Sequence, residues 1–158
     1  MARYITHPAA RSFVAGGFVA GTLGGLIFGA FLFAIGLARY PTTYQVIASG
    51  ILGRTAFTTT NYAWAGIGIH FAIAVVAAII YAYAAQMSGL LGRPLLGGTI
   101  FGLAANGVMD VVVYARGLAP LPTTWHDIGI QAVAHVVFFG IPVAWYLSRY
   151  ERVPVPYS

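Results

Sequence analysis

Long stretches without a charged side chain constrain this sequence more than any other feature. Residues 12–38, 55–92 and 128–148 contain no Asp, Glu, Lys or Arg. Each stretch is longer than the roughly 20 residues with which a helix crosses the hydrocarbon core of a bilayer. Only 7% of the residues are charged, whereas about a quarter are charged in a typical soluble domain. The sequence therefore predicts an integral membrane protein.

A fourth apolar stretch contains a single acidic residue, Asp110. Backbone groups in lipid must be satisfied within the chain, so stretches of this composition cross a membrane as helices. We therefore expect an all-α membrane protein, a single domain over residues 1–158 that forms a bundle of four transmembrane helices. The expected spans are Ser12–Ala38, Trp64–Gln86, Leu95–Ala115 and Gly129–Ser148.

The net charge of +5 comes from arginines scattered singly between the apolar stretches. They form no basic cluster, so we expect no nucleic-acid partner. The chain has no cysteine, which excludes disulfides and Cys-ligated metals. Cytoplasmic loops carry an excess of Lys and Arg, and a bias of five arginines against three predicts that both termini are cytoplasmic. The five are Arg3, Arg11, Arg93, Arg149 and Arg152, and the three are Arg39, Arg54 and Arg116.

The segment GLARYPTTY, which ends at Tyr44, is nearly repeated by GLAPLPTTW, which ends at Trp125. The same shift of 81 residues aligns Gly17 and Gly21 with Gly98 and Gly102. The first and third expected spans therefore resemble copies in one register. Two hairpins of the same orientation predict a parallel repeat, related by a pseudo-twofold axis along the membrane normal.

The repeated loop has a composition suited to the membrane surface. Proline ends a helix, threonine can cap the next one, and an aromatic side chain is stable at the interface. We expect both copies at the periplasmic interface. They consist of Pro41, Thr42, Thr43 and Tyr44, and of Pro122, Thr123, Thr124 and Trp125.

The second and fourth spans also correspond. A histidine precedes a tyrosine by eleven residues in both, His70 before Tyr81 and His135 before Tyr146. The connection before the histidine is longer in the first copy, and we expect the extra residues to form a short interfacial helix or lid. This places repeat one at about 12–86, its interfacial insert at about 45–63, and repeat two at about 93–148.

Glycine recurs at every fourth residue of the first expected span, at Gly17, Gly21, Gly25 and Gly29. Small residues at this spacing let a second helix approach closely. The equivalent residues of the third span are Gly98, Gly102, Asn106 and Asp110. We therefore expect helix packing along both glycine stripes and a polar outer end in the third span.

His70, Asp110 and His135 fall at similar depths on three different spans, and Asn106 precedes Asp110 by one helical turn. A charge at the centre of a membrane helix costs about 2.5–3.5 kcal/mol or more, so these side chains should face the bundle interior. We refer to these four residues as the polar layer.

Three interpretations of the polar layer are open. It can be a hydrogen-bonded plug that fixes the helix register. It can bind a divalent metal through two histidines and a carboxylate, or haem b between two histidines. It can also serve as a path for protons or small solutes, continued by Tyr81 and Tyr146. The sequence does not single out a cofactor among these.

Three stretches resemble the YagU-like group of small bacterial inner-membrane proteins. They are WAGIGIHFAIAVVAAIIY, GGTIFGLAANGVMDVVVYARGLAPLP and AHVVFFG, and they cover about half of the chain. The resemblance includes the spacing of His70 and Tyr81, the glycine-rich third span, and His135. It implies a four-helix protein of the bacterial inner membrane and no particular reaction.

The function expected from these observations is non-enzymatic, because nearly all residues belong to spans and short loops. We expect helix packing with other membrane subunits, as an accessory subunit, or with further copies of the chain. The alternatives are a small-solute or proton-linked transporter or channel, and a haem- or metal-binding redox protein.

Overall fold

The computed structural model describes residues 10–36, 38–114 and 125–149. All regular elements in these ranges are helical, and none is a strand. Within the described residues, four helices are long and apolar enough to cross a membrane, over Val14–Ala34, Tyr62–Ser88, Pro94–Val111 and Ile128–Leu147. The prediction of an all-helical protein with four candidate membrane spans is confirmed.

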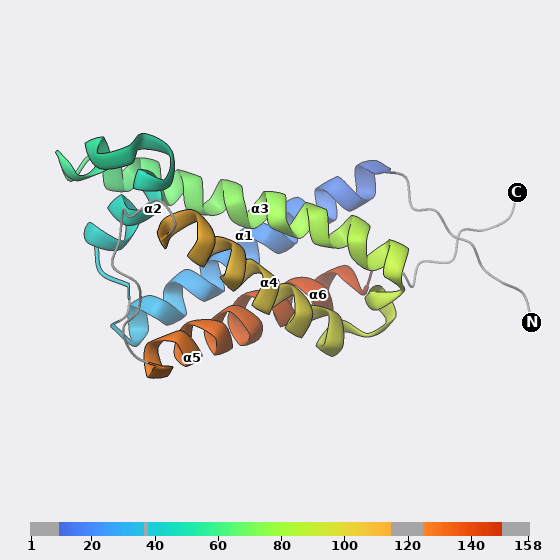
Figure 1. Ribbon diagram of the computed structural model, residues 1–158. Coiled ribbons are helices and arrows are strands. Elements are labelled where there is room, and N and C mark those ends of the chain that lie inside the picture. The colour runs from blue at the N-terminus through green and yellow to red at the C-terminus, as the bar shows by residue number, and fades with distance from the viewer. Residues whose placement is uncertain (1–9, 37, 115–124, 150–158) are drawn as a thin grey trace, which may run out of the picture.

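The spans run back and forth through the bundle (Figure 1). The start of α1, the end of α3, the start of α4 and the end of α6 lie at one end, and α2 and η1 lie at the other. The elements are α1 (Ala10–Ala34), α2 (Thr42–Leu52), η1 (Gly53–Phe57), α3 (Tyr62–Ser88), η2 (Leu90–Gly92), α4 (Pro94–Tyr114), α5 (Trp125–Ala134), η3 (His135–Gly140) and α6 (Ile141–Leu147). Because α5, η3 and α6 follow one another without a break, they form one span, here called the fourth span.

The first span ends four residues earlier than the sequence indicated, at Ala34 rather than Ala38. Gly36 has a φ of 74°, a left-handed conformation that glycine adopts without steric cost. Its N–H bonds to the carbonyl of Phe33 at 3.1 Å, and the N–H of Ala38 bonds to the carbonyl of Leu32 at 2.9 Å. These bonds satisfy carbonyls at the end of α1 and turn the chain toward α2.

Glycines bring α1 against α3 and α4 against the fourth span at backbone distance. A Cβ atom on Gly21 would lie 2.5 Å from the Cα of Val75, and one on Gly102 would lie 2.6 Å from the Cα of Val136. Contacts this short leave no room for a side chain, so these positions accept glycine alone. Gly17 against Ile79 and Gly98 against Ile141 make equally close contacts one turn away. A Cβ on Gly25 would meet the Ala74 methyl at 3.3 Å.

Gly29 does not belong to this packing stripe, contrary to the expectation from its spacing. Among the described residues, no atom beyond the adjacent backbone of α1 lies within 4 Å of the place where its Cβ would be. The helix surface at Gly29 faces a pocket instead of a neighbouring helix. The i+4 pattern continues past the point where α1 and α3 stop touching, and the sequence pattern alone does not mark that point.

The fourth span contains a π-helical segment, η3, which was not predicted. The N–H of Ile141 bonds to the carbonyl of Val136, five residues back, instead of four. Pro142 follows at once, and proline has no N–H for the carbonyl four residues before it. The helix accommodates Pro142 by a wide turn just before it. In this turn, Gly140 lies directly against the backbone of Gly98 and Gly102.

We predict that Gly21→Ala destabilises the protein more than Gly29→Ala does. The added methyl at Gly21 would overlap the α3 backbone, which costs about 1–3 kcal/mol where a packed site is overfilled. The methyl at Gly29 meets open space. Thermal unfolding of both variants in the same detergent measures the difference. Equal melting temperatures would contradict the described α1–α3 contact.

Candidate functional site

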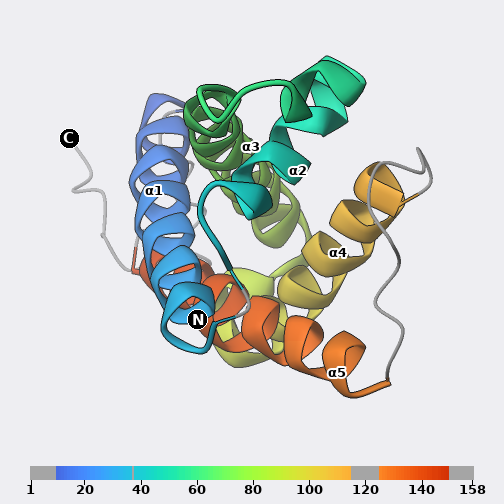
Figure 2. The ribbon, with the colours of Figure 1, turned by 90° about the vertical axis from the view of Figure 1, so that its left-hand side faces the viewer.

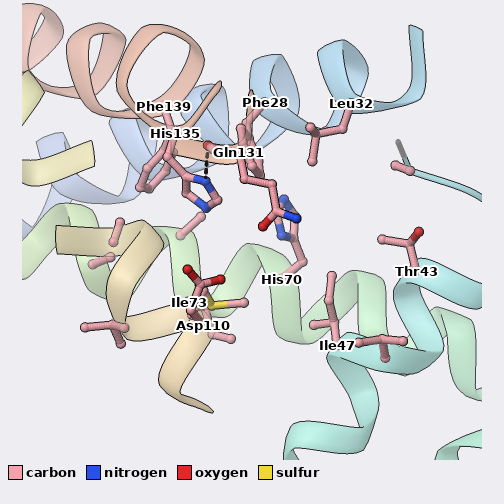
Figure 3. Close-up of a pocket in the computed structure, with 18 of the residues that line it drawn as sticks. Phe28, Leu32, Thr43, Ile47, His70, Ile73, Asp110, Gln131, His135 and Phe139 are labelled. Carbon is pink, nitrogen blue, oxygen red and sulfur yellow. Dashed lines mark hydrogen bonds between the residues drawn. The ribbon is translucent and has the colours of Figure 1, made fainter. Parts of the chain in front are cut away.

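A pocket of about 490 Å³ lies inside the bundle, between α3 and α4. This volume is within the range of roughly 300–1,000 Å³ found for small-molecule sites. The pocket's lining is mostly apolar and comes from α1, α2, α3, α4 and the fourth span (Figure 3). The side chains with polar groups that line it are Thr43, Tyr44, His70, Asp110, Gln131 and His135.

The pocket follows from the way the helices pack. α1 packs on α3 and on the fourth span, and α4 packs on the fourth span, whereas α3 and α4 barely touch. The glycine contacts thus close three sides of the bundle and leave the fourth side open. Figure 2 shows α2 across one end of the bundle, near α3 and α4. There, Tyr44 and Ile47 form the end wall of the pocket.

α2 is anchored to α3 by a further close glycine contact. The carbonyl of Tyr44 lies directly against Gly66 of α3. The side-chain amide of Gln45 donates a hydrogen bond to the carbonyl of Thr59 at 3.0 Å. A helix was expected in this insert, and the structure begins it at Thr42, so that most of the first repeated loop belongs to α2.

The mouth of the pocket faces the outside of the bundle, where lipid would be. Ile73 and Ile80 of α3 line the pocket and are 39% and 62% exposed. Val108 of α4 lines it from the opposite side and is 63% exposed. These apolar side chains belong both to the pocket and to the membrane-facing surface, so the opening between them connects the two.

His70 and His135 both line the pocket, and each is held by a backbone carbonyl. His70 Nε2 lies 3.3 Å from the carbonyl oxygen of Gly25. His135 Nδ1 lies 2.9 Å from the carbonyl oxygen of Gln131. The ring of Phe28 contacts both imidazoles, with centroids 6.3 Å from His70 and 4.3 Å from His135. Phe28 and Gln131 were not recognised from the sequence, although Gln131 lies one turn before His135.

Asp110 lines the pocket from α4 and is bonded to the next member of the polar layer. The Nδ2 of buried Asn106 donates to Asp110 Oδ2 at 2.9 Å. Among the described residues, Asn106 Oδ1 has no hydrogen-bond partner. Within the same residues, no hydrogen bond links Asp110 to His70 or His135. The polar layer therefore surrounds a shared space without being a closed hydrogen-bonded plug.

The described residues contain no group of three His, Cys, Asp or Glu placed to hold a metal ion. To bind a haem between them, the two imidazoles would have to displace the Phe28 ring, which packs on both of them. The residues present therefore do not fit the metal and haem interpretations of the polar layer.

The two tyrosines of the expected proton path lie elsewhere. Tyr81 is buried, stacks on Phe101 and has its hydroxyl directly over Gly97. It is not part of the pocket lining. Tyr146 lies on α6, packed against the core. The structure therefore does not bring the two histidine–tyrosine pairs into one continuous polar path.

The two copies of the repeated loop differ in their surroundings. Thr43 Oγ1 accepts a hydrogen bond from the N–H of Arg39 at 2.8 Å, and Tyr44 stacks near Phe33. Trp125 is 89% exposed at the start of α5. Pro122, Thr123 and Thr124 lie outside the described residues. Tyr44 thus packs against the protein, whereas Trp125 faces its surroundings.

Comparisons with known proteins leave the chain without an assigned family: no family model matches it, and neither a curated protein nor a solved structure does. These results do not bear on the YagU-like resemblance, which stays a hypothesis.

We predict that Asn106 and Asp110 are energetically coupled. Asn106→Ala removes the donor to Asp110 and leaves a charged group less well satisfied, a change that costs about 1–3 kcal/mol. In a chain that already carries Asp110→Ala, the same substitution should cost less. Unfolding free energies of the two single variants and the double variant give the coupling. A coupling of zero would contradict the described hydrogen bond.

Proposed function

We propose that this chain is a membrane-embedded binding protein that takes up a largely apolar molecule from the bilayer through the opening between α3 and α4. The observation that carries this proposal is a pocket of about 490 Å³ with an apolar lining and an apolar mouth. A ligand that entered from the lipid would pass between apolar side chains at the mouth. Sites with a mostly apolar wall and a few convergent polar groups are the usual form of small-molecule pockets.

The proposed role is binding without catalysis. The two histidines are each held by a backbone carbonyl, and the carboxylate is held by an amide. Such fixed polar groups orient a ligand well. α2 covers one end of the pocket and leaves the side opening between Ile80 and Val108, which favours lateral exchange with lipid.

The function expected from the sequence, an accessory subunit or a homo-oligomer, is the second candidate. The observation that favours it is the same open side of the bundle, because a helix of a partner subunit or of a second copy could cover the exposed Ile80 and Val108. The two candidates differ in what occupies the pocket, a small molecule or side chains of a partner.

The proposed location is the bacterial inner membrane with both termini in the cytoplasm. The arginine bias and the YagU-like resemblance support it. Equivalent glycines contact the second helix of each hairpin, which supports a repeat of the hairpin itself, but the contact of α1 with the fourth span has no comparable counterpart between α3 and α4, as a pseudo-twofold axis would require. Gly17 faces Ile79 in the first hairpin, and its equivalent Gly98 faces Ile141 in the second.

The orientation predicts opposite signals from two reporter fusions. A fusion after Ser158 should show a cytoplasmic reporter, and a fusion after Thr58, between η1 and α3, should show a periplasmic one. Alkaline phosphatase and green fluorescent protein report the two sides. The reverse pattern would overturn the proposed orientation.

We predict that filling the pocket abolishes ligand uptake. Ala105 lines the pocket, so Ala105→Phe places an aromatic ring in the space of the ligand. Leu103→Phe is the matched control, because Leu103 is on the same helix, is exposed, and does not line the pocket. Native mass spectrometry of protein released from nanodiscs should find a small apolar adduct on the unmodified chain and on Leu103→Phe.

Ala105→Phe should carry no such adduct while it keeps its melting temperature within a few degrees. An unmodified chain that has no adduct and forms stable oligomers would favour the second candidate. Crosslinks from a photoreactive residue at Ile80 to a protein, and none to lipid, would also favour the second candidate.

A further inference from the structure

The polar end of the pocket offers hydrogen-bond acceptors from three different helices. A carbonyl oxygen can only accept, so the ring nitrogen that bonds to it must carry the proton. The proton of neutral His70 is thus on Nε2, facing the Gly25 carbonyl, and that of neutral His135 is on Nδ1, facing the Gln131 carbonyl. The other nitrogen of each neutral ring is an acceptor.

Asp110 adds acceptors of its own. One carboxylate oxygen receives the Asn106 amide, and the other has no hydrogen-bond partner among the described residues. In Figure 3, the second nitrogen of the His135 ring is directed toward the side of the pocket where Asp110 lies. Two acceptors that face one space need a donor between them, because each loses its hydration without compensation otherwise.

The remaining polar groups do not supply a positive charge. Among the described residues that line the pocket there is no Lys or Arg. The Thr43 hydroxyl accepts from the N–H of Arg39 and can still donate its own proton, the Tyr44 hydroxyl can donate as well, and the Gln131 amide can either donate or accept, but all three groups are neutral. Among the described residues that line the pocket, Asp110 is therefore the dominant charge at this end.

The apolar part of the pocket extends away from these groups along both walls. On α3 the lining runs from His70 to Ile80, and on α4 from Asp110 to Phe101. Ten residues of helix correspond to about 15 Å. This length suits one alkyl or isoprenoid chain, and Ala77, Ala104 and Ala105 leave room for it because their side chains are small.

We propose that the ligand is a single-chain amphiphile whose polar end is a hydrogen-bond donor, a hydroxyl or an ammonium group, held by Asp110, His135 and His70. The proposal rests on the proposed function, because it names the ligand class of the same pocket. We expect carboxylate and phosphate ends to bind less tightly, because they bring further acceptors next to the Asp110 carboxylate, and no Lys or Arg is among the described residues that line the pocket.

Three probes with the same chain test the proposal: dodecylamine, dodecan-1-ol and dodecanoate. The full chain is titrated with each in maltoside micelles, and dissociation constants are derived from the shift of its melting temperature. The amine and the alcohol should bind about tenfold or more tightly than the carboxylate, the difference expected for a charge-assisted hydrogen bond. General attraction to a chain with a net charge of +5 would favour the carboxylate instead.

The variant Asp110→Asn places a donor where the charge was and should reduce the affinity for dodecylamine by about tenfold. Thr99→Val is the matched control, because Thr99 is a polar residue of α4 outside the pocket lining. It should bind all three probes like the unmodified chain. Loss of dodecylamine binding in both variants would overturn the assignment to Asp110.

The outcomes separate the two proposals. Equal binding of all three probes that is lost in Ala105→Phe would leave the pocket as a binding site and overturn the donor selectivity. Preference for dodecanoate would also overturn it. No binding of any probe, with the unmodified chain folded, would contradict the proposed function itself.

Discussion

Backbone contact at glycine is the constraint on which the rest of this structure depends. Gly21 against Val75 and Gly102 against Val136 bring each hairpin's helices together with no side chain between them. In lipid, close van der Waals contact of this kind is a principal source of helix association, because the hydrophobic effect does not act between helices there. Strong contact within each hairpin, and between α1 and the fourth span, leaves α3 and α4 apart. The open side of the bundle follows from where the glycines are.

The role of the polar layer depends on this separation of α3 from α4. If α3 packed on α4, His70 and Asp110 could close on each other and form the plug that the sequence allows. Because the helices are apart, His70, Asp110 and His135 line a shared space, and each is hydrogen-bonded to a backbone carbonyl or a side-chain amide instead of to another of the three. These local hydrogen bonds reduce the free-energy cost of placing polar groups in a membrane. The hydrogen-bonding positions that the three side chains do not use face the pocket.

The sequence predicts the spans well because the absence of charge over 20 residues has one structural solution in a bilayer. It also predicts the contacts of Gly17, Gly21, Gly98 and Gly102, since their spacing is local. It does not show where a stripe ends, as Gly29 illustrates, because that depends on the angle between helices. The π turn before Pro142 and the packing of Phe28 on two histidines depend on tertiary contacts, so no periodicity reveals them.

The most direct test of the account is a crystal structure of the protein crystallised from a lipid mesophase without added ligand. In that structure, α3 and α4 should stand apart, and an elongated density should run between them from Ile80 toward Asp110. Side chains of α3 packed directly on α4, with no cavity between them, would contradict it. An open cavity that contains ordered water alone would contradict the binding of an apolar molecule.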